Sequence, residues 1–316
     1  MEKFGFLFSG QGAQYPQMGM DLYQADPLFK ETIDRANEIL TEMDLIAVLN
    51  NEADALSQTK YVQPAIVAVS LGLFAMLKRD LPELQPTAML GLSLGEYAAL
   101  IASQAVSFET GIAVLQDRAK YMQADADLTP SMMAALLQPQ IPLVEEICRD
   151  CSTSEESVVI ANYNSPKQVV IGGNQAAVQK AMTMIAEKGG AKRVVELKVS
   201  GAFHTPLFAN ASQKMQNRLA QVTFADLQVP VISNTTCQPF EKTQIAPTLV
   251  KQLINPTHFS ECSSYMFDKL GVNAVLELGP GDTLCKFVKQ IDRQVARYHI
   301  ENYEGYQAFI KTIRGN

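Results

Sequence analysis

Short apolar runs that end near glycine residues recur along the chain and predict an α/β fold. Phe4–Phe8, Thr87–Leu90 and Ala274–Leu278 are mainly apolar. Such runs are typical of buried strands in a parallel sheet. Ala65–Leu77 is apolar nearly all round, which predicts a helix in the centre of the molecule, with Pro64 in its first turn.

The pattern changes between residues 130 and 200. It predicts, in order, strand Met132–Leu137, helix Leu143–Arg149, strands Val158–Asn162 and Gln168–Ile171, helix Gln175–Glu187 and strand Arg193–Val199. This β-α-β-β-α-β order is the ferredoxin-like arrangement. Pro130 precedes it and Ser200-Gly201 follows it as hinges. We therefore expect a small subdomain at 129–199, inserted into a larger α/β subdomain formed by 1–128 and 200–316.

Composition limits the class of protein. The 316 residues are 47% hydrophobic and 19% charged, as in a globular protein of about two domains. The net charge of -7 argues against a protein that mainly binds nucleic acid. The most apolar stretch is shorter than the ~20 residues of a bilayer span, and the N-terminus lacks a secretory signal pattern. We expect a cytoplasmic protein that does not bind membranes.

The cysteines form no recognisable framework. All five are scattered along the chain, which does not match a disulfide-rich protein. Cys148 and Cys151 form a C-x-x-C, but they lie late in a predicted helix, with no second pair and no nearby histidine. We interpret the pair as incidental and expect no metal site.

Ser93 is the candidate nucleophile. The sequence Gly91-x-Ser93-x-Gly95 lies between a predicted strand and a predicted helix, Tyr97–Ala105. In that context it is the nucleophile elbow, where small residues allow a turn sharp enough to expose a serine hydroxyl. The backbone N–H groups that follow, that of Leu94 first, would stabilise an oxyanion. The alternative is a serine that caps a helix between packing glycines. The context favours catalysis.

His204 is the candidate base for this serine. A serine hydroxyl needs a base within hydrogen-bond reach, and the chain has three histidines. His299 lies in a polar stretch and is expected at the surface, and the surroundings of His258 favour a packing role. His204 follows the last predicted strand of the small subdomain. It would lie at the seam between subdomains, where sites usually form.

Arg118 is a candidate for binding an anion. It falls inside the apolar arc of a predicted helix over Thr110–Ala124. A buried guanidinium is unfavourable unless an anion meets it. An internal salt bridge or a side chain that reaches solvent is one interpretation, and a bidentate pair with a substrate carboxylate is the other.

The small subdomain also has a local excess of basic residues. Between Asn164 and Ser200 these are Lys167, Lys180, Lys188, Lys192, Arg193 and Lys198, against two glutamates. They form either a solvated face or a surface for an anionic ligand, such as a nucleotide phosphate or an acidic protein.

Several strings together carry a resemblance over essentially the whole chain. They are FSGQGAQ at 8–14, TKYVQPAI at 59–66, GLSLGEYAAL at 91–100, DRAKYMQ at 117–123, NYNSPKQVVIGG at 162–173, AKRVVELKVSGAFHTPL at 191–207, QLINP at 252–256 and LELGPG at 276–281. In order and spacing the chain resembles the malonyl-CoA:acyl carrier protein transacylases of bacterial type II fatty acid synthesis. It is also similar to the acyltransferase domains of polyketide synthases. The resemblance implies an α/β-hydrolase-like large subdomain with an inserted ferredoxin-like small subdomain.

The resemblance also implies roles for individual residues. Ser93 would be acylated, with His204 as general base and later acid. Gln11 would support the oxyanion hole beside the Leu94 amide, and Arg118 would bind the malonate carboxylate. No acidic third member is implied, because backbone carbonyl groups near Gln252 orient the histidine in this family. Further family positions near CoA or its pantetheine arm are Asn162, Asn164, Gln168, Lys192 and Arg193.

Two positions bear on selectivity. Family members often have histidine before the nucleophile, where this chain has Leu92. That change would alter the polarity of the pocket or the rate of the reaction. It would leave the other site residues in place. Phenylalanine before the active-site histidine accompanies malonyl selectivity in polyketide acyltransferases. Phe203 therefore suggests malonyl, because its ring would crowd an α-methyl group.

We expect a ping-pong transfer of malonyl from malonyl-CoA to the phosphopantetheine thiol of holo acyl carrier protein. The reaction would need no cofactor, and we expect a monomer. Alternatives are a discrete polyketide acyltransferase, a hydrolase that clears acyl groups from carrier protein with the same serine, and a non-catalytic scaffold that docks the carrier. Arg118 argues against the hydrolase, since a clearing enzyme would be expected to accept chains without a terminal carboxylate.

Overall fold

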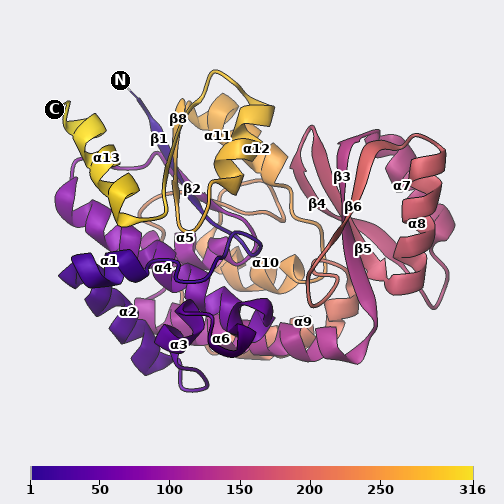
Figure 1. The fold of residues 1–316 in the computed structure, drawn as a ribbon, viewed down its shortest axis with the longest axis horizontal. Coiled ribbons are helices and arrows are strands. Elements are labelled where there is room, and N and C mark those ends of the chain that lie inside the picture. The colour runs from indigo at the N-terminus through magenta and orange to yellow at the C-terminus, as the bar shows by residue number, and fades with distance from the viewer. Residues whose placement is uncertain (1, 316) are drawn as a thin grey trace.

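A computed structural model describes residues 2–315 and contains two separate sheets (Figure 1). The larger has the order β7-β2-β1-β8-β9, and all its pairs are parallel. Its strands are β1 (Phe4–Phe8), β2 (Ala88–Gly91), β7 (Val231–Ile232), β8 (Ala274–Leu278) and β9 (Ala296–Ile300). Phe8 is in register with Gly91 on one side and Leu278 on the other. The turns that follow β1, β2 and β8 therefore meet at the carboxyl ends of these strands, where ligands bind in parallel sheets.

Helices cover both faces of the parallel sheet. Phe6 and Phe8 belong to the core that contains helix α4, whereas Leu7, between them, packs with residues of α11 and α12. This alternation explains why β1 is apolar at every position. The helices of this subdomain are α1 (Met20–Ala25), α2 (Pro27–Ile39), α3 (Leu45–Leu49), α4 (Thr59–Asp80), α5 (Gly95–Ala102), α6 (Phe108–Leu128), α9 (Ala209–Leu219), α10 (Ile245–Gln252), α11 (Phe259–Leu270), α12 (Thr283–Ile291) and α13 (Tyr303–Arg314), with short 3-10 turns at Glu52–Ser57, Pro206–Phe208 and Lys242–Gln244.

Helix α4 is the central helix that the sequence predicts, but it begins earlier than expected. It starts at Thr59, so Pro64 lies in its second turn and the expectation of a first-turn proline was wrong. Within residues 2–315, α4 is the one helix long and apolar enough to span a membrane, and 78% of that window is buried inside the protein. It therefore has the character of a core helix.

The smaller sheet is antiparallel, with the order β4-β5-β3-β6. Its elements are β3 (Ser131–Pro139), α7 (Ile141–Cys151), β4 (Val158–Ser165), β5 (Gln168–Asn174), α8 (Gln175–Glu187) and β6 (Ala191–Leu197). Residues Ala134 and Leu136 pack with α7 and α8, which lie beyond the sheet from the large subdomain in Figure 1. The alternate residues Met133 and Ala135 line a cavity on the other side. The expected α/β fold with a ferredoxin-like insertion is confirmed.

Candidate active site

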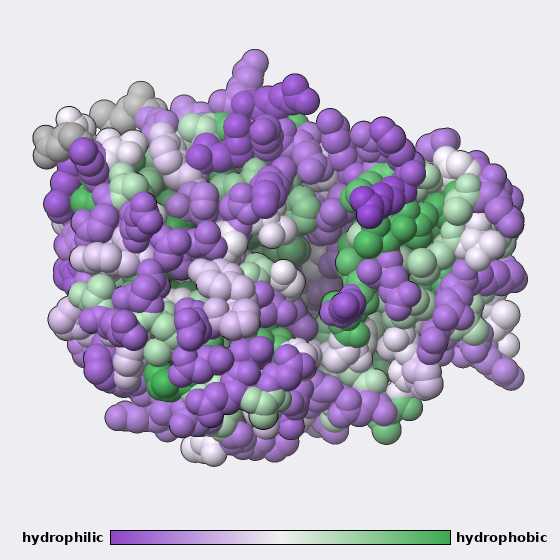
Figure 2. Space-filling model, viewed as in Figure 1, coloured by the Kyte–Doolittle hydropathy of each residue, from purple (hydrophilic) through white to green (hydrophobic). Residues whose placement is uncertain are grey.

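The site lies between the two subdomains, where Figure 2 shows the surface hollowed. A cavity of about 260 Å³ opens between the carboxyl ends of the parallel strands and the face of the antiparallel sheet that α7 and α8 do not cover. Its lining is mixed, with amides and hydroxyls on a largely apolar wall. The lining residues include Gln11, Gln63, Leu92, Ser93, Met122, Met133, Asn162, Asn164, Gln168, Phe203, His204, Thr283 and Phe287.

The turn between β2 and α5 has the geometry of a nucleophile elbow. Ser93 has φ +56, a left-handed backbone conformation that residues other than glycine rarely adopt. Both flanking glycines are required by close backbone contacts. A Cβ on Gly91 would lie 1.9 Å from the Gly95 carbonyl carbon, and a Cβ on Gly95 would lie 2.4 Å from the Phe8 carbonyl oxygen. The backbone of α5 therefore packs against β1, and Ser93 lines the cavity.

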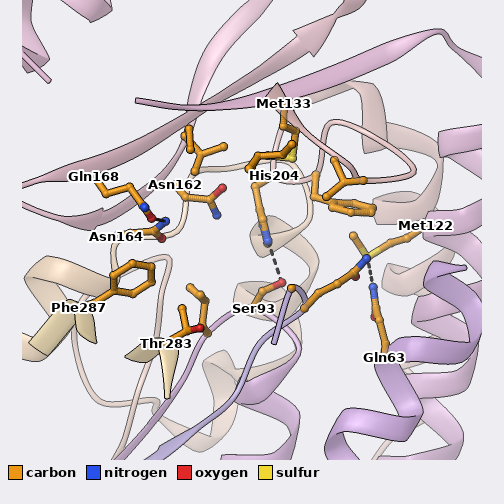
Figure 3. A pocket seen from close by; sticks show the side chains of 18 residues that line it. Gln63, Ser93, Met122, Met133, Asn162, Asn164, Gln168, His204, Thr283 and Phe287 are labelled. Carbon is orange, nitrogen blue, oxygen red and sulfur yellow. Dashed lines mark hydrogen bonds between the residues drawn. The ribbon is translucent and has the colours of Figure 1, made fainter. Parts of the chain in front are cut away.

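Ser93 and His204 are brought together from segments far apart in the sequence (Figure 3). His204 Nε2 lies 2.8 Å from Ser93 Oγ, and His204 Nδ1 lies 2.8 Å from the backbone oxygen of Gln252. A carbonyl can only accept, so Nδ1 carries the proton. Neutral Nε2 therefore accepts from the serine hydroxyl, and this tautomer is the one that can act as base.

Burial keeps His204 neutral. The side chain is 3% exposed, and burial lowers its pKa to about 4, helped by the charge of Arg118 and opposed by the Gln252 carbonyl. Like Ser93, it has a left-handed backbone, with φ +62. The imidazole is therefore neutral, and able to act as a base, at pH values well below the usual pKa of histidine.

We expect kcat/KM for malonyl-CoA to stay nearly constant as the pH falls from 7 to 5.5. This expectation follows because His204, with a pKa of about 4, remains neutral over that range. Initial rates across the range, for the wild type and for Glu96→Gln as a control that removes a neighbouring titratable group, would measure it. An acid limb centred near pH 6.5 in both proteins would contradict the assignment.

An oxyanion site lies beside the serine. Among the residues that the structure describes, no acceptor is hydrogen-bonded to the Leu94 N–H, at the start of α5. Gln11 lines the same cavity, and its Nε2 donates to Thr59 Oγ1 at 3.3 Å. One backbone donor is therefore free, and a side-chain amide lies in the turn after β1. Both are of the type that stabilises a tetrahedral oxyanion.

Arg118 is fully buried on α6, with its guanidinium at the nucleophile. One terminal nitrogen donates to Gln63 Oε1, and the other donates to Gln252 Oε1 at 2.8 Å and to Ser93 Oγ at 3.1 Å. Within residues 2–315 its hydrogen bonds go to amides and a hydroxyl, and Arg118 Nε has no partner. Neither the salt bridge nor the solvent-reaching side chain considered for it is found. A carboxylate bound in the cavity would supply the missing anion.

A buried carboxyl group, that of Glu96, holds two residues that bond to the backbone of Ser93. Glu96 on α5 accepts hydrogen bonds from the backbone N–H of Asn234 and from Gln252 Nε2. Asn234 Oδ1 in turn accepts from the Ser93 N–H at 2.7 Å, and Gln252 Nε2 donates to the Ser93 carbonyl at 3.0 Å. Burial raises the pKa of Glu96 to about 8, although these hydrogen bonds and Arg118 favour its ionised form.

We expect the free energy of unfolding to fall by about 1 kcal/mol between pH 7 and pH 8 because of Glu96. The unfolded chain releases this proton near pH 4.5, whereas the folded protein holds it up to about pH 8. Stability therefore decreases as the pH rises through that window, since the folded state binds more protons. His204 acts in the opposite direction only between pH 4 and 6.5.

Denaturant unfolding at several pH values would measure this fall. Glu96→Gln should remove most of the fall between pH 7 and 8 and leave the smaller contribution of Glu277, whose pKa burial raises to about 7. The exposed Glu187→Gln should leave the fall unchanged. An equal fall in the wild type and Glu96→Gln would mean that another group titrates there.

The remaining candidate residues divide into two groups. Asn162, Asn164 and Gln168 line the cavity, and Asn164 Nδ2 donates to Gln168 Oε1 at 2.9 Å (Figure 3). Asn164 Oδ1 is buried and has no partner among the described residues. Lys192 and Arg193 instead lie exposed on the edge strand β6 and do not line the cavity.

The other predictions about single residues have clear outcomes. Phe203 lines the cavity and packs on Phe208, with ring centroids 5.3 Å apart. His299 is exposed, as expected, and His258 stacks on Tyr163 at 4.9 Å. The six basic residues between Asn164 and Ser200 are all exposed. Cys148 and Cys151 are free and buried in α7.

Sequence reasoning missed several residues of the site. Asn234 and Thr283 come from segments with no recognisable pattern, and only the fold brings them to the elbow or the cavity. Gln63 lies in the string at 59–66 that carries the resemblance, but no role was assigned to it. Glu96 could have been found, because it is the one charged residue in the helix GEYAALIA. A carboxyl group in an apolar helix is a sign of a buried polar network.

The chain is similar to known proteins over nearly its full length. The family model of the acyl transferase domain matches residues 5–306. The malonyl CoA-acyl carrier protein transacylase of Bacillus subtilis is 32% identical over 315 residues, covering 99% of this chain and 98% of the relative. The solved structure of MCAT from Streptococcus pneumoniae is 41% identical with a TM-score of 0.92, covering 98% of this chain and 100% of that one.

A second solved structure contains a partner. It is a type II PKS acyl-carrier protein in complex with its malonyl-transacylase, 29% identical with a TM-score of 0.92, covering 99% of this chain and 100% of that one. The family model and the identity over nearly the full length lead to one conclusion: the chain belongs to the malonyl-CoA:acyl carrier protein transacylases, within the acyl transferase family.

Proposed function

We propose that this chain transfers malonyl from malonyl-CoA to the phosphopantetheine thiol of holo acyl carrier protein through a malonyl ester on Ser93. The observation that carries the proposal is the contact between Arg118 and the nucleophile, at 3.1 Å. A dicarboxylic thioester has one carboxylate to bind and one thioester carbonyl to attack. A buried guanidinium beside an activated serine suits both groups.

In the first half-reaction, Ser93 Oγ attacks the thioester carbonyl carbon and gives its proton to His204 Nε2. The negative charge that develops on the carbonyl oxygen is stabilised by the Leu94 N–H and by Gln11. The carbon–sulfur bond then breaks, and His204 returns the proton to the departing CoA sulfur. Gln252 supports the imidazolium through its backbone oxygen, which holds Nδ1–H at 2.8 Å.

The second half-reaction uses the same groups in reverse. The carrier thiol gives its proton to His204 and attacks the ester carbonyl, and Ser93 Oγ leaves with that proton. Each step is balanced by protein groups alone, so the proposed reaction requires no cofactor. Asn162, Asn164 and Gln168 would bind the amides of the pantetheine arm, with the free Asn164 Oδ1 as an acceptor.

The partners follow from the same surfaces. We propose that the exposed bases of the small subdomain, Lys192 and Arg193 among them, bind CoA phosphates or the acidic face of the carrier protein. A monomer in the cytoplasm remains our proposal, and the five free cysteines fit a reducing compartment. We propose fatty acid synthesis as the pathway. The complex of a type II PKS carrier with a similar transacylase keeps the polyketide alternative open.

Intact-protein mass spectrometry would test the function. The chain is incubated briefly with malonyl-CoA, acetyl-CoA or methylmalonyl-CoA, and holo acyl carrier protein is then added. We expect an adduct that forms selectively from malonyl-CoA and then moves onto the carrier. An adduct that forms with any of the acyl groups and is then hydrolysed, without transfer to the carrier, would indicate the hydrolase. Absence of any adduct would indicate the scaffold.

Phe203 should determine selectivity against an α-methyl group. We expect Phe203→Ser to raise kcat/KM for methylmalonyl-CoA relative to malonyl-CoA by about 10- to 200-fold, the range for one methyl group in a pocket. Competition between the two substrates, read by the mass of the adduct, measures the ratio. Phe208→Leu, which changes the ring behind Phe203, is the matched control. An unchanged ratio in Phe203→Ser would contradict the role.

A further inference from the structure

Three side chains of the kind that bind metal ions meet outside the active site. Cys237 lies in the loop after β7, His258 precedes α11, and Glu261 lies in its first turn. Cys237 Sγ donates to Glu261 Oε2 at 3.4 Å, and His258 Nδ1 lies 3.7 Å from the same oxygen. All three ligand atoms lie within 4.8 Å of one another.

These separations match a tetrahedral metal site. With Zn–S near ~2.3 Å and Zn–N and Zn–O near ~2.0–2.2 Å, a tetrahedral site places sulfur and oxygen roughly 3.5–3.7 Å apart and nitrogen and oxygen roughly 3.3–3.6 Å apart. The sulfur–oxygen and nitrogen–oxygen separations, 3.4 and 3.7 Å, differ from those ranges by at most about a tenth of an ångström. Two of the three ligand pairs are therefore close to coordinating separations before any ion binds, and the third lies within 4.8 Å.

His258 supplies a second, independent observation. Its Nδ1 is buried and has no hydrogen-bond partner among the described residues. The ring stacks on Tyr163, with an interplanar angle of 8°, and the backbone N–H of His258 donates to the Asn234 backbone oxygen at 3.0 Å. A buried ring nitrogen that lacks a protein partner is expected to have another ligand, such as water or an ion.

We propose that Cys237, His258 and Glu261 bind one divalent transition-metal ion, and that the ion is Zn²⁺. A thiolate, an imidazole and a carboxylate together suit zinc better than the hard cations, which prefer oxygen alone. Binding would release the thiol proton of Cys237 to solvent. Glu261 is 65% exposed, so water can take the fourth position. The trio is dispersed over 25 positions of sequence with no metal-binding spacing, which is why the sequence predicted no such site.

The ion would act on the fold near the active site, without contact to the reacting atoms. It would join the loop after β7 to the start of α11. Asn234, in that loop, accepts the Ser93 N–H through its side chain and the His258 N–H through its backbone. A metal ion here would hold the segment that supports the elbow, so its role would be structural.

Cobalt and zinc titrations of the full chain would test the proposal. The reduced protein is freed of metal with a chelator and titrated with Co²⁺. We expect one ion per chain, tetrahedral visible bands and a thiolate charge-transfer band that Zn²⁺ displaces. Zinc should also raise the thermal midpoint. Cys237→Ser should lose the charge-transfer band, and His258→Gln and Glu261→Gln should weaken binding at least ~10-fold.

The exposed His299→Gln serves as the control for binding elsewhere and should bind like the wild type. Circular dichroism verifies that each variant is folded. The proposal is overturned if the wild type binds no ion with a micromolar or lower dissociation constant. It is equally overturned if folded Cys237→Ser binds zinc as tightly as the wild type. Because neither readout uses acyl transfer, the result is independent of the proposed function.

Discussion

Ser93→Ala is expected to form no acyl adduct and to lower the transfer rate on the order of 10⁶-fold, the loss typical of a serine nucleophile. His204→Ala should lose about as much, because the serine hydroxyl has no other base within hydrogen-bond distance among the described residues. The two residues act as a unit, so the double variant should be no slower than either single one. Transfer of labelled malonyl to holo carrier protein measures the rates.

Ser200→Ala is a matched control for this prediction. Ser200 does not line the cavity, and its Oγ contacts Thr59 Oγ1, which also accepts from Gln11. The control should retain activity within a few fold. A His204→Ala variant slowed only about tenfold would require a different base and would overturn the dyad.

Arg118→Ala should separate substrates by their charge. We expect kcat/KM for malonyl-CoA to fall roughly 30- to 4,000-fold, the range for losing one partner of a buried, hydrogen-bonded charge pair. Transfer of acetyl, which has no carboxylate, should fall far less. The ratio of the two rates is the measurement, since any general disturbance of Ser93 or Gln252 affects both substrates alike.

Arg118→Lys provides the second variant. Lysine keeps the charge but cannot form a bidentate pair, so it should lie between the wild type and alanine for malonyl and close to the wild type for acetyl. Equal losses of malonyl and acetyl transfer in Arg118→Ala would remove the carboxylate role from this residue.

The sequence predicts most of the elements that position the site. Runs such as Phe4–Phe8 are apolar at every position because helices cover both faces of the strand, so the sequence alone identifies it. The ferredoxin-like insertion is also predicted, because its strands and helices follow one another closely. The helices α1 to α3 and α9 to α13 and the strands β7 and β9 are not predicted. Elements such as α2 and β9 are half polar, and α3 and β7 are short, so their positions depend on tertiary contacts rather than on local pattern.

The same distinction applies to the site. Ser93 and its glycines are recognised from the sequence, because backbone contact determines those residue types locally. The hydrogen bonds that join Glu96, Asn234 and Gln252 link positions more than 130 residues apart. No short pattern encodes such contacts. The exact start of α4 was also misjudged, because Pro64 was taken to mark the first turn, whereas the helix begins at Thr59.

The left-handed backbones of Ser93 and His204 have a consequence for the evolution of this protein. Each such conformation costs about 1–2 kcal/mol in a residue with a side chain, and both occur at the reacting pair. Glycine would relieve the strain at either position but would remove the reacting group. Selection for turnover and selection for stability therefore oppose each other at these two residues. The rest of the fold must compensate, through bonds such as that from the Ser93 N–H to Asn234.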